Sequence, residues 1–403
     1  MDVEGLRAQI PALRSTIYLN TGWSGPSPLP VQEAITRRLQ REIDEGPTTR
    51  PVFEERQAIG KAARAAMARF INAEPEEIAL CANTTTGLNI VLNGLHFSPG
   101  DDVVTCDMEH SSGIVPLYFL RERAGVEIKV VRLSAQDAQE RIVDQFAAAM
   151  TAKTRLVLLS EISYSSGLRL PLKEITALAH ARGAQVLVDG AQTAGHISLD
   201  MRELEMDYYA FPGHKWLLGP DGVGGLFVRG DLIEALEPSA MAGRAAREYD
   251  FEGKFVPERE KIQKFELSTS NGALWAGLTA AIEFQEGAGK DAIEERIRRH
   301  AGLAIQELSA IPNVRVVSPL EGAGICGLVC FSVEGIEPPE VTAQLWQRRS
   351  AVMRSVRETA STRLSLHFFN TEEEIRQVAA AVAELAAEGP RETSPSSRLS
   401  FDA

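Results

Sequence analysis

The fold is decided by three neighbouring stretches of the chain: LVLL at residues 156–159, LKEITALAHA at 172–181 and VLVD at 186–189. The first and third are short apolar runs that contain β-branched valine, as buried strands do. The middle stretch repeats apolar residues at intervals of three and four, which is the period of an amphipathic helix. A strand, a helix and a second strand in this order predict an α/β fold with parallel strands.

The same alternation extends outward in both directions, from about residue 78 to residue 228. Further short apolar runs occur at 103–106 and 128–131, with helical patterns between them. Strands that alternate with helices predict a mostly parallel sheet covered by helices on both faces. In such sheets ligands bind at the carboxyl ends of the strands, so the polar segments that follow strands form the candidate site.

The pattern changes after about residue 250. Longer helical patterns cover residues 272–286 and 293–308, and strand patterns lie near 314–317 and 328–333. This region is predicted to form a smaller α+β domain. The predicted units are a large domain of residues 15–250, a small domain of residues 1–14 and 251–388, and a disordered tail of residues 389–403, which is rich in serine and charge.

The overall composition limits the classes of partner. The 403 residues are 44% hydrophobic and 24% charged, as in a globular enzyme, and the net charge is -13. Nucleic acid is not an expected partner, because phosphate backbones are bound by clustered Lys and Arg. The first ten residues carry charges and no run of ~20 apolar residues follows, so no secretory signal or membrane span is predicted and a cytoplasmic location is expected.

The four cysteines are Cys81, Cys106, Cys326 and Cys330, in apolar or strand-like contexts without a CxxC pair. Unpaired cysteine in such a context is usually a buried free thiol. We therefore expect neither a disulfide framework nor a metal site.

The strongest chemical signal is a lysine in a glycine-flanked turn. FPGHKW at residues 211–216 precedes GPDGVGG at 219–225, and Lys215 follows His214. Burial and neighbouring cations at such a place lower the pKa of an amine, as a lysine that forms an imine requires. Asp189 ends an apolar strand upstream, and pyridoxal 5'-phosphate (PLP) needs a carboxylate against its pyridine nitrogen.

Two further segments follow predicted strands. Thr84 and Thr85 open a helical pattern, where hydroxyls and helix-start amides can bind a phosphate or simply cap the helix. His110 follows the strand at 103–106 and can lie over a cofactor ring or carry a proton.

Taken together, these motifs resemble the class V aminotransferase group of fold-type I PLP enzymes. This group includes cysteine desulfurases, isopenicillin N epimerase-like proteins and cystine C–S lyases. The likeness extends from YLNTG at residues 18–22 to FNTEEE at 369–374, and the combination of DGAQ at 189–192 with GHKWLLGPDGVGG at 213–225 carries it. The resemblance implies a large domain with a mostly parallel, seven-stranded sheet and a smaller α+β domain.

The resemblance also implies a role for individual residues. Lys215 matches the lysine that holds PLP as a Schiff base, and His110 and Asp189 match its other catalytic partners, which stack on the ring and face the pyridinium. Gln192 matches the donor to the ring phenolate. The other implied contacts are Thr84, Thr85, His214 and Thr269 for the phosphate, Ser165 for the ring oxygen, and Asn20, Trp23, Arg354 and Arg363 for the substrate. The family takes the Thr269 contact from the neighbouring subunit, which implies a homodimer with a shared active site.

Three departures from the family pattern affect the predicted function. Pro212 stands where a hydroxyl residue usually binds the phosphate, and Tyr164 with Ser165 replaces an asparagine beside the ring. The segment MRSVRETASTR at residues 353–363 contains no cysteine, whereas desulfurases place the attacking cysteine shortly before the arginine that matches Arg363. Persulfide-forming desulfurase chemistry is therefore disfavoured.

The resemblance then favours a PLP-dependent lyase that cleaves a C–S bond by β-elimination from cystine or another cysteine-derived amino acid. Arg363 matches the clamp on the substrate α-carboxylate, and Arg354 matches a second substrate arginine of cystine lyases. An epimerase or an aminotransferase acting on another amino acid is the alternative, because one base lysine serves all three reactions. The sequence leaves the physiological substrate open.

Overall fold

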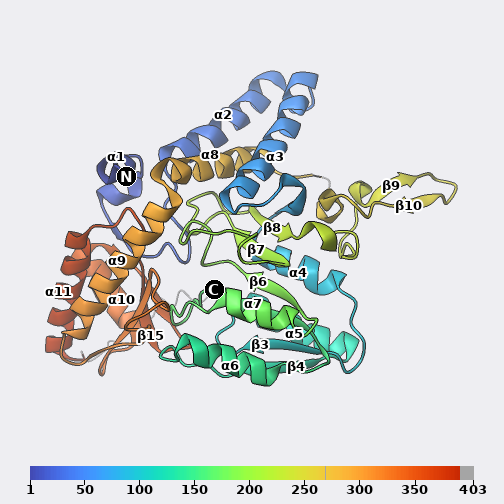
Figure 1. Ribbon diagram of the computed structural model, residues 1–403. Coiled ribbons are helices and arrows are strands. Elements are labelled where there is room, and N and C mark those ends of the chain that lie inside the picture. The colour runs from blue at the N-terminus through green and yellow to red at the C-terminus, as the bar shows by residue number, and fades with distance from the viewer. Residues whose placement is uncertain (268, 391–403) are drawn as a thin grey trace.

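A seven-stranded sheet forms the centre of the computed structural model, which describes residues 1–267 and 269–390 (Figure 1). The strand order is β2-β8-β7-β6-β5-β3-β4. Strand β8 runs antiparallel to both of its neighbours, and the pairs between β7 and β4 are parallel, so the predicted mostly parallel sheet is confirmed. The bounds are β2 (Ile78–Cys81), β3 (Asp102–Cys106), β4 (Glu127–Val131), β5 (Thr154–Ser160), β6 (Gln185–Asp189), β7 (Tyr208–Pro212) and β8 (Gly224–Val228).

The two faces of the sheet are covered because neighbouring side chains in a strand point to opposite sides. In β5, Val157 and Leu159 pack with helices α6 (Gln139–Ala149) and α7 (Leu172–His180). Leu156 and Leu158 pack on the other side with α4 (Thr84–Gly94) and α5 (Ser111–Ala124). All four side chains are fully buried, and burial of each contributes roughly 1.5–3 kcal/mol. A continuously apolar strand is thus what a sheet with two covered faces requires.

A second, four-stranded antiparallel sheet has the order β11-β12-β15-β14. Its core joins strand residues such as Phe331 and Leu364 to helix residues such as Ala301, Leu345 and Val378, which is the predicted α+β arrangement. The strands are β11 (Val314–Val316), β12 (Leu328–Val333), β14 (Arg354–Val356) and β15 (Ser361–Ser365), and the helices are α9 (Lys290–Ser309), α10 (Pro338–Arg349) and α11 (Glu372–Glu388).

The N-terminal segment contacts this second unit at two places. Helix α1 (Val3–Ala8) carries Arg7, whose guanidinium lies 2.6 Å from the carboxylate of Glu374 in α11. Strand β1 (Ile17–Tyr18) pairs in parallel with β13 (Ala351–Val352). These contacts join the N-terminal segment to α11 and to β13.

Helix α8 (Gly272–Ala288) lies against α2 (Leu29–Glu45) and α3 (Arg50–Phe70) beside the large sheet (Figure 1). The approach is close, because a Cβ atom added to Gly277 would lie 2.7 Å from Ile35 Cγ1. The predicted domain limits at residues 15 and 250 stay predictions. Most of the predicted tail, residues 391–403, lies outside the described residues.

The remaining elements include a hairpin of β9 (Ala246–Tyr249) and β10 (Phe255–Pro257) that extends away from the main body (Figure 1). In the part of the chain that the structure describes, no helix is both long enough and apolar enough to cross a membrane.

Candidate active site

Three predicted catalytic residues meet at the carboxyl edge of the large sheet. Asp189 is the last residue of β6, Lys215 follows β7, and His110 follows β3. Since β3, β6 and β7 run in the same direction, their ends lie at one edge. The charges of Asp189 and Lys215 act on each other and on His110. The structure thus brings together the three residues that the sequence singled out.

The environment of Lys215 favours its neutral amine. Burial, together with the positive charges of Arg363 and Arg354, lowers the pKa of Lys215 to about 8, although the carboxylate of Asp189 acts in the opposite direction. An amine with this pKa is substantially unprotonated in mildly alkaline solution. Lys215 can therefore act as a nucleophile toward an aldehyde and as a proton acceptor.

Asp189 is a buried carboxylate, only 3% exposed. Its Oδ1 accepts a hydrogen bond of 2.9 Å from the backbone N–H of Ala191. Burial raises the pKa of Asp189, and the nearby charge of Lys215 works in the opposite direction. A buried anion of this kind is stabilised by a cationic partner such as a pyridinium N–H.

His110 is held in one orientation at the start of α5. Its Nδ1 accepts a 3.1 Å hydrogen bond from the backbone N–H of Ser112, and the ring of Tyr164 meets it edge-on at 4.9 Å. Burial, and then the charge of Lys215, lower the pKa of His110. The ring is therefore neutral at physiological pH, with its proton on Nε2. Ser112 was not predicted from the sequence.

Two of the predicted phosphate residues, Thr84 and Thr85, are the first residues of α4. The hydroxyl of Thr85 donates to Ser112 Oγ over 2.9 Å, and Asn83 Oδ1 caps the helix by accepting from the N–H of Thr86 over 2.9 Å. Thr84 Oγ1 at the start of α4 and His214 Nδ1 after β7 are buried and have no hydrogen-bond partner in the described chain, although His214 Nδ1 lies 3.7 Å from the Asp221 carboxylate. Buried polar atoms of native proteins are nearly always paired, so a bound anion fits this place.

The start of α4 reaches this position because Gly87 allows a close approach. A Cβ atom at Gly87 would lie 2.8 Å from the Cβ of Ala210 in β7. Pro212, the last residue of β7, is buried and offers no hydroxyl, as the sequence predicted. Thr84 and His214 are the groups left to bind an anion on that side.

Gln192 is locked by a neighbour that sequence reasoning missed. The indole N–H of Trp216 donates to Gln192 Oε1 over 2.8 Å, and Gln192 Nε2 donates to the Gly22 carbonyl over 2.9 Å. Trp216 is itself fully buried and stacks on His196 at 3.7 Å. The amide is thus fixed with one Nε2 hydrogen left for another acceptor.

Arg354 and Arg363 lie directly opposite each other on β14 and β15. Arg363 is 1% exposed, and its Nη1 donates to the Tyr164 carbonyl over 2.8 Å. Its Nε and Nη2 are buried and have no partner within the described chain, and burial lowers its pKa to about 10. Two adjacent free donors on a guanidinium match the two oxygens of a carboxylate.

Arg354 and the remaining substrate residues border this guanidinium. The Arg354 guanidinium lies over the Trp23 ring at 4.7 Å, a favourable cation–π contact. Asn20 pairs through its backbone with Ser365, two residues beyond Arg363. Asn20 Oδ1, Thr21 Oγ1 and Ser365 Oγ are buried polar atoms without a hydrogen-bond partner in the described chain. Thr21 lies within the YLNTG motif but was not predicted as a site residue, and no pattern in the sequence indicated Ser365.

Two predicted residues are placed differently. Ser165 is buried with its hydroxyl 3.2 Å from that of Ser163, so a contact with a cofactor stays a prediction. Thr269 is exposed and makes no hydrogen bond within the described chain.

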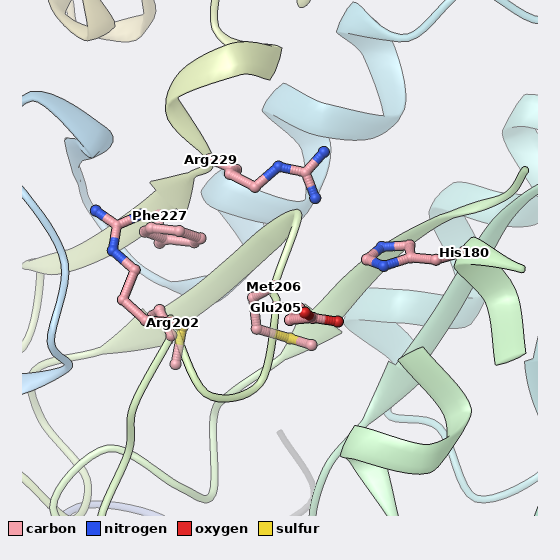
Figure 2. A pocket seen from close by; sticks show the side chains of 7 residues that line it. His180, Arg202, Glu205, Met206, Phe227 and Arg229 are labelled. Carbon is pink, nitrogen blue, oxygen red and sulfur yellow. The ribbon is translucent and has the colours of Figure 1, made fainter. Parts of the chain in front are cut away.

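A cavity of about 350 Å³ lies at the other edge of the sheet (Figure 2). It is lined by His180, Arg202, Glu205, Met206 and Arg229 among others, and Figure 2 shows how these side chains border it. His180 and Arg229 both bind the buried Asp207 beneath it. It contains none of the predicted site residues.

Known proteins resemble this chain over nearly its whole length. The family model described as "Aminotransferase class-V" matches residues 26–378. The chain belongs to the aminotransferase class-V family. It is 34% identical to a probable cysteine desulfurase of Methanothermobacter thermautotrophicus, over 96% of this chain and 99% of that protein. It is 30% identical to the isopenicillin N epimerase of Amycolatopsis lactamdurans, over 94% and 97% respectively.

Among solved structures, the cystine C–S lyase C-DES in complex with its reaction product cysteine persulfide superimposes with a TM-score of 0.88. The identity is 31%, and the match covers 95% of this chain and all of that one. A second C-DES structure, a mutant with glycine covalently linked to the PLP cofactor, has a TM-score of 0.87, 31% identity, and coverage of 94% and 99%. This class V enzyme is thus PLP-dependent, with a fold-type I architecture.

Proposed function

We propose that this class V enzyme is a lyase that cleaves a C–S bond by β-elimination from cystine or a related cysteine-derived amino acid. The observation that carries the proposal is the pair of arginines, Arg354 and Arg363, opposite each other on β14 and β15. The free Nε and Nη2 of Arg363 suit an α-carboxylate. Arg354, which makes no ion pair within the described chain, suits an anionic group at the far end of the substrate.

The cysteines support elimination rather than persulfide transfer to the protein. All four cysteines of the chain are buried free thiols, and burial raises the pKa of each of them. A thiol that attacks a substrate sulfur must be accessible and easily ionised. The hairpin between β14 and β15 carries no cysteine.

The chain's own residues account for binding and proton transfer. His110 and Asp189 would help to hold PLP, which would supply an electron sink for the electron pair left by removal of the α-proton. Lys215 Nζ accepts that proton, while Arg363 holds the α-carboxylate. The Cβ–S bond then breaks and its electron pair leaves with sulfur. With cystine, one water is consumed and the products are pyruvate, ammonia and cysteine persulfide.

The test is incubation of the holoenzyme with L-cystine and, separately, with L-cysteine, with pyruvate, alanine and persulfide sulfur measured. The expected result is pyruvate from cystine in step with persulfide. In Arg354→Gln, the kcat/KM for cystine should fall about tenfold or more, because one charged contact is lost. An exposed control, Arg357→Gln, should change it little.

Other products would assign a different reaction. D-cystine or exchange of the α-hydrogen without pyruvate would identify an epimerase. Amino-group transfer to a 2-oxo acid would identify an aminotransferase, and alanine from cysteine a desulfurase. Any of these as the main product overturns the lyase proposal.

A homodimer with a shared active site is part of the same proposal. The exposed Thr269 is free to reach a partner's phosphate site. Around the β9–β10 hairpin, the exposed apolar side chains Met241, Tyr249, Phe251, Phe255 and Leu267 favour burial against a second copy. Sedimentation of the holoenzyme should give twice the chain mass, and a monomer with full activity would exclude the shared site.

A further inference from the structure

The hairpin that carries the two arginines also carries a glutamate. Glu358 lies in the turn between β14 and β15, four residues after Arg354 and five before Arg363. The turn is closed by a 3.1 Å hydrogen bond from the Ala360 N–H to the Arg357 carbonyl. Glu358 is exposed, and in the described chain neither it nor Arg354 belongs to an ion pair.

The turn is fastened to the active site. The Thr359 hydroxyl donates to the Ser165 carbonyl over 2.9 Å. This bond places Glu358 near Tyr164, whose pKa is raised by burial and then by the Glu358 carboxylate. Tyr164 in turn meets the His110 ring edge-on at 4.9 Å. Glu358 therefore stands at the side of the site, next to the ring of His110.

Arg354 and Glu358 act on the same two groups. Both charges are felt by the Tyr164 hydroxyl and by the His110 ring. In the described chain they do not form an ion pair with each other. Arg354 is held away by its contact over Trp23. Two opposite charges kept apart at one place match a ligand that carries both charges.

The other carboxylates near the site are engaged elsewhere. Asp189 is buried beneath the lysine and accepts from Ala191. Glu109 accepts from both the N–H and the hydroxyl of Ser160, over 2.7 and 2.8 Å. Unlike these two carboxylates, Glu358 is exposed.

We propose that Arg354 and Glu358 form a subsite for a second α-amino-acid head group, with Arg354 binding its carboxylate and Glu358 its ammonium. The inference rests on the proposed function and narrows its substrate class. The preferred substrates are bis-amino acids, zwitterionic at both ends, such as symmetrical cysteine disulfides. Thioether or disulfide conjugates whose far end is only a carboxylate bind more weakly.

A pair of inert ligands tests the subsite by binding alone. L,L-2,7-diaminosuberate has the length of cystine without sulfur, and L-2-aminosuberate lacks only its far ammonium. Calorimetry on the holoenzyme should give at least about tenfold tighter binding of the diamine. Glu358→Gln should remove most of that preference by weakening the diamine. The exposed control Glu334→Gln should retain the full preference.

Two results would overturn the subsite: equal affinity for both ligands in the natural protein, or an unchanged ratio in Glu358→Gln. The outcome is separate from that of the lyase proposal. An enzyme that makes no pyruvate from cystine but keeps the Glu358-dependent ratio refutes the reaction and retains the subsite. Pyruvate formation from cystine, together with an affinity ratio that does not depend on Glu358, supports the reaction and refutes the subsite.

Discussion

The two edges of the central sheet differ in how their buried polar groups are satisfied. At the carboxyl edge and on β15 of the second sheet, Thr84, His214 and Arg363 have buried atoms without a hydrogen-bond partner in the described chain. At the amino edge, around the cavity of Figure 2, Asp207 accepts from His180, Arg229 and the Val186 N–H. The buried polar groups at the carboxyl edge can thus pair with a ligand, whereas those at the amino edge are already paired within the protein.

This difference separates residues that serve chemistry from residues that serve stability. Unpaired buried groups cost free energy, so they persist where a ligand pairs with them. Fully paired charges, such as Arg202 with Glu77, gain nothing further from a ligand. The cavity by itself is therefore not a sign of function. The predictions below test this contrast from the largest effect to the smallest.

The largest effect is expected at Lys215. Lys215→Ala removes the proton acceptor and the amine that holds PLP, and kcat/KM for cystine should fall about ten-thousandfold. The absorbance band of the bound cofactor should also lose its imine character. Pyruvate release by a stopped assay and a spectrum measure the two effects. Arg202→Gln at the other edge is the control and should retain activity; comparable loss there would erase the contrast.

Asp207→Asn should instead affect stability. The change leaves Arg229 and His180 without their buried anion, and the free energy of unfolding should fall by about 2–5 kcal/mol. Chemical denaturation of the holoenzyme measures this loss, and kcat/KM should stay within about twofold. A large loss of activity in the folded variant would mean that the amino edge has a part in catalysis.

Thr84→Ala should weaken cofactor binding. Loss of one hydrogen bond to a charged phosphate corresponds to about a tenfold higher Kd for PLP. Titration of the apo protein with PLP measures it. Thr86→Ala is the matched control, because the Thr86 hydroxyl is already bonded to Asn83 at 3.1 Å. Equal effects of both changes would argue against a role for Thr84 in the phosphate site.

The smallest effect is a shift in pH dependence. Lys215 reacts with PLP as the free amine, which exists above its pKa, so the rate of PLP recombination should rise with pH to an inflection near 8. Arg363 lowers the pKa of Lys215, so Arg363→Gln should move the inflection upward, by less than about one unit. A downward shift would contradict the placement of the two residues. Arg202→Gln should leave the inflection unchanged.

Local patterns in the sequence predict the α/β class, the parallel sheet and the position of Asp189 and His110 after strands. These follow from local rules, because apolar periodicity defines the elements and parallel strands bring their ends to one edge. The absence of a hairpin cysteine was also readable directly. Motif resemblance added Arg354 and Arg363, which no periodicity distinguishes from surface arginines.

Tertiary structure alone decided which polar groups are paired. Whether Arg363 keeps two free donors, or Trp216 fixes Gln192, depends on side chains from segments far apart in the chain. The same holds for Glu358, which the sequence presents as one exposed acid among many. Its position beside Tyr164 results from the bond between Thr359 and Ser165, residues nearly two hundred positions apart. Such pairings form only when segments far apart in the chain pack together, so no local pattern encodes them.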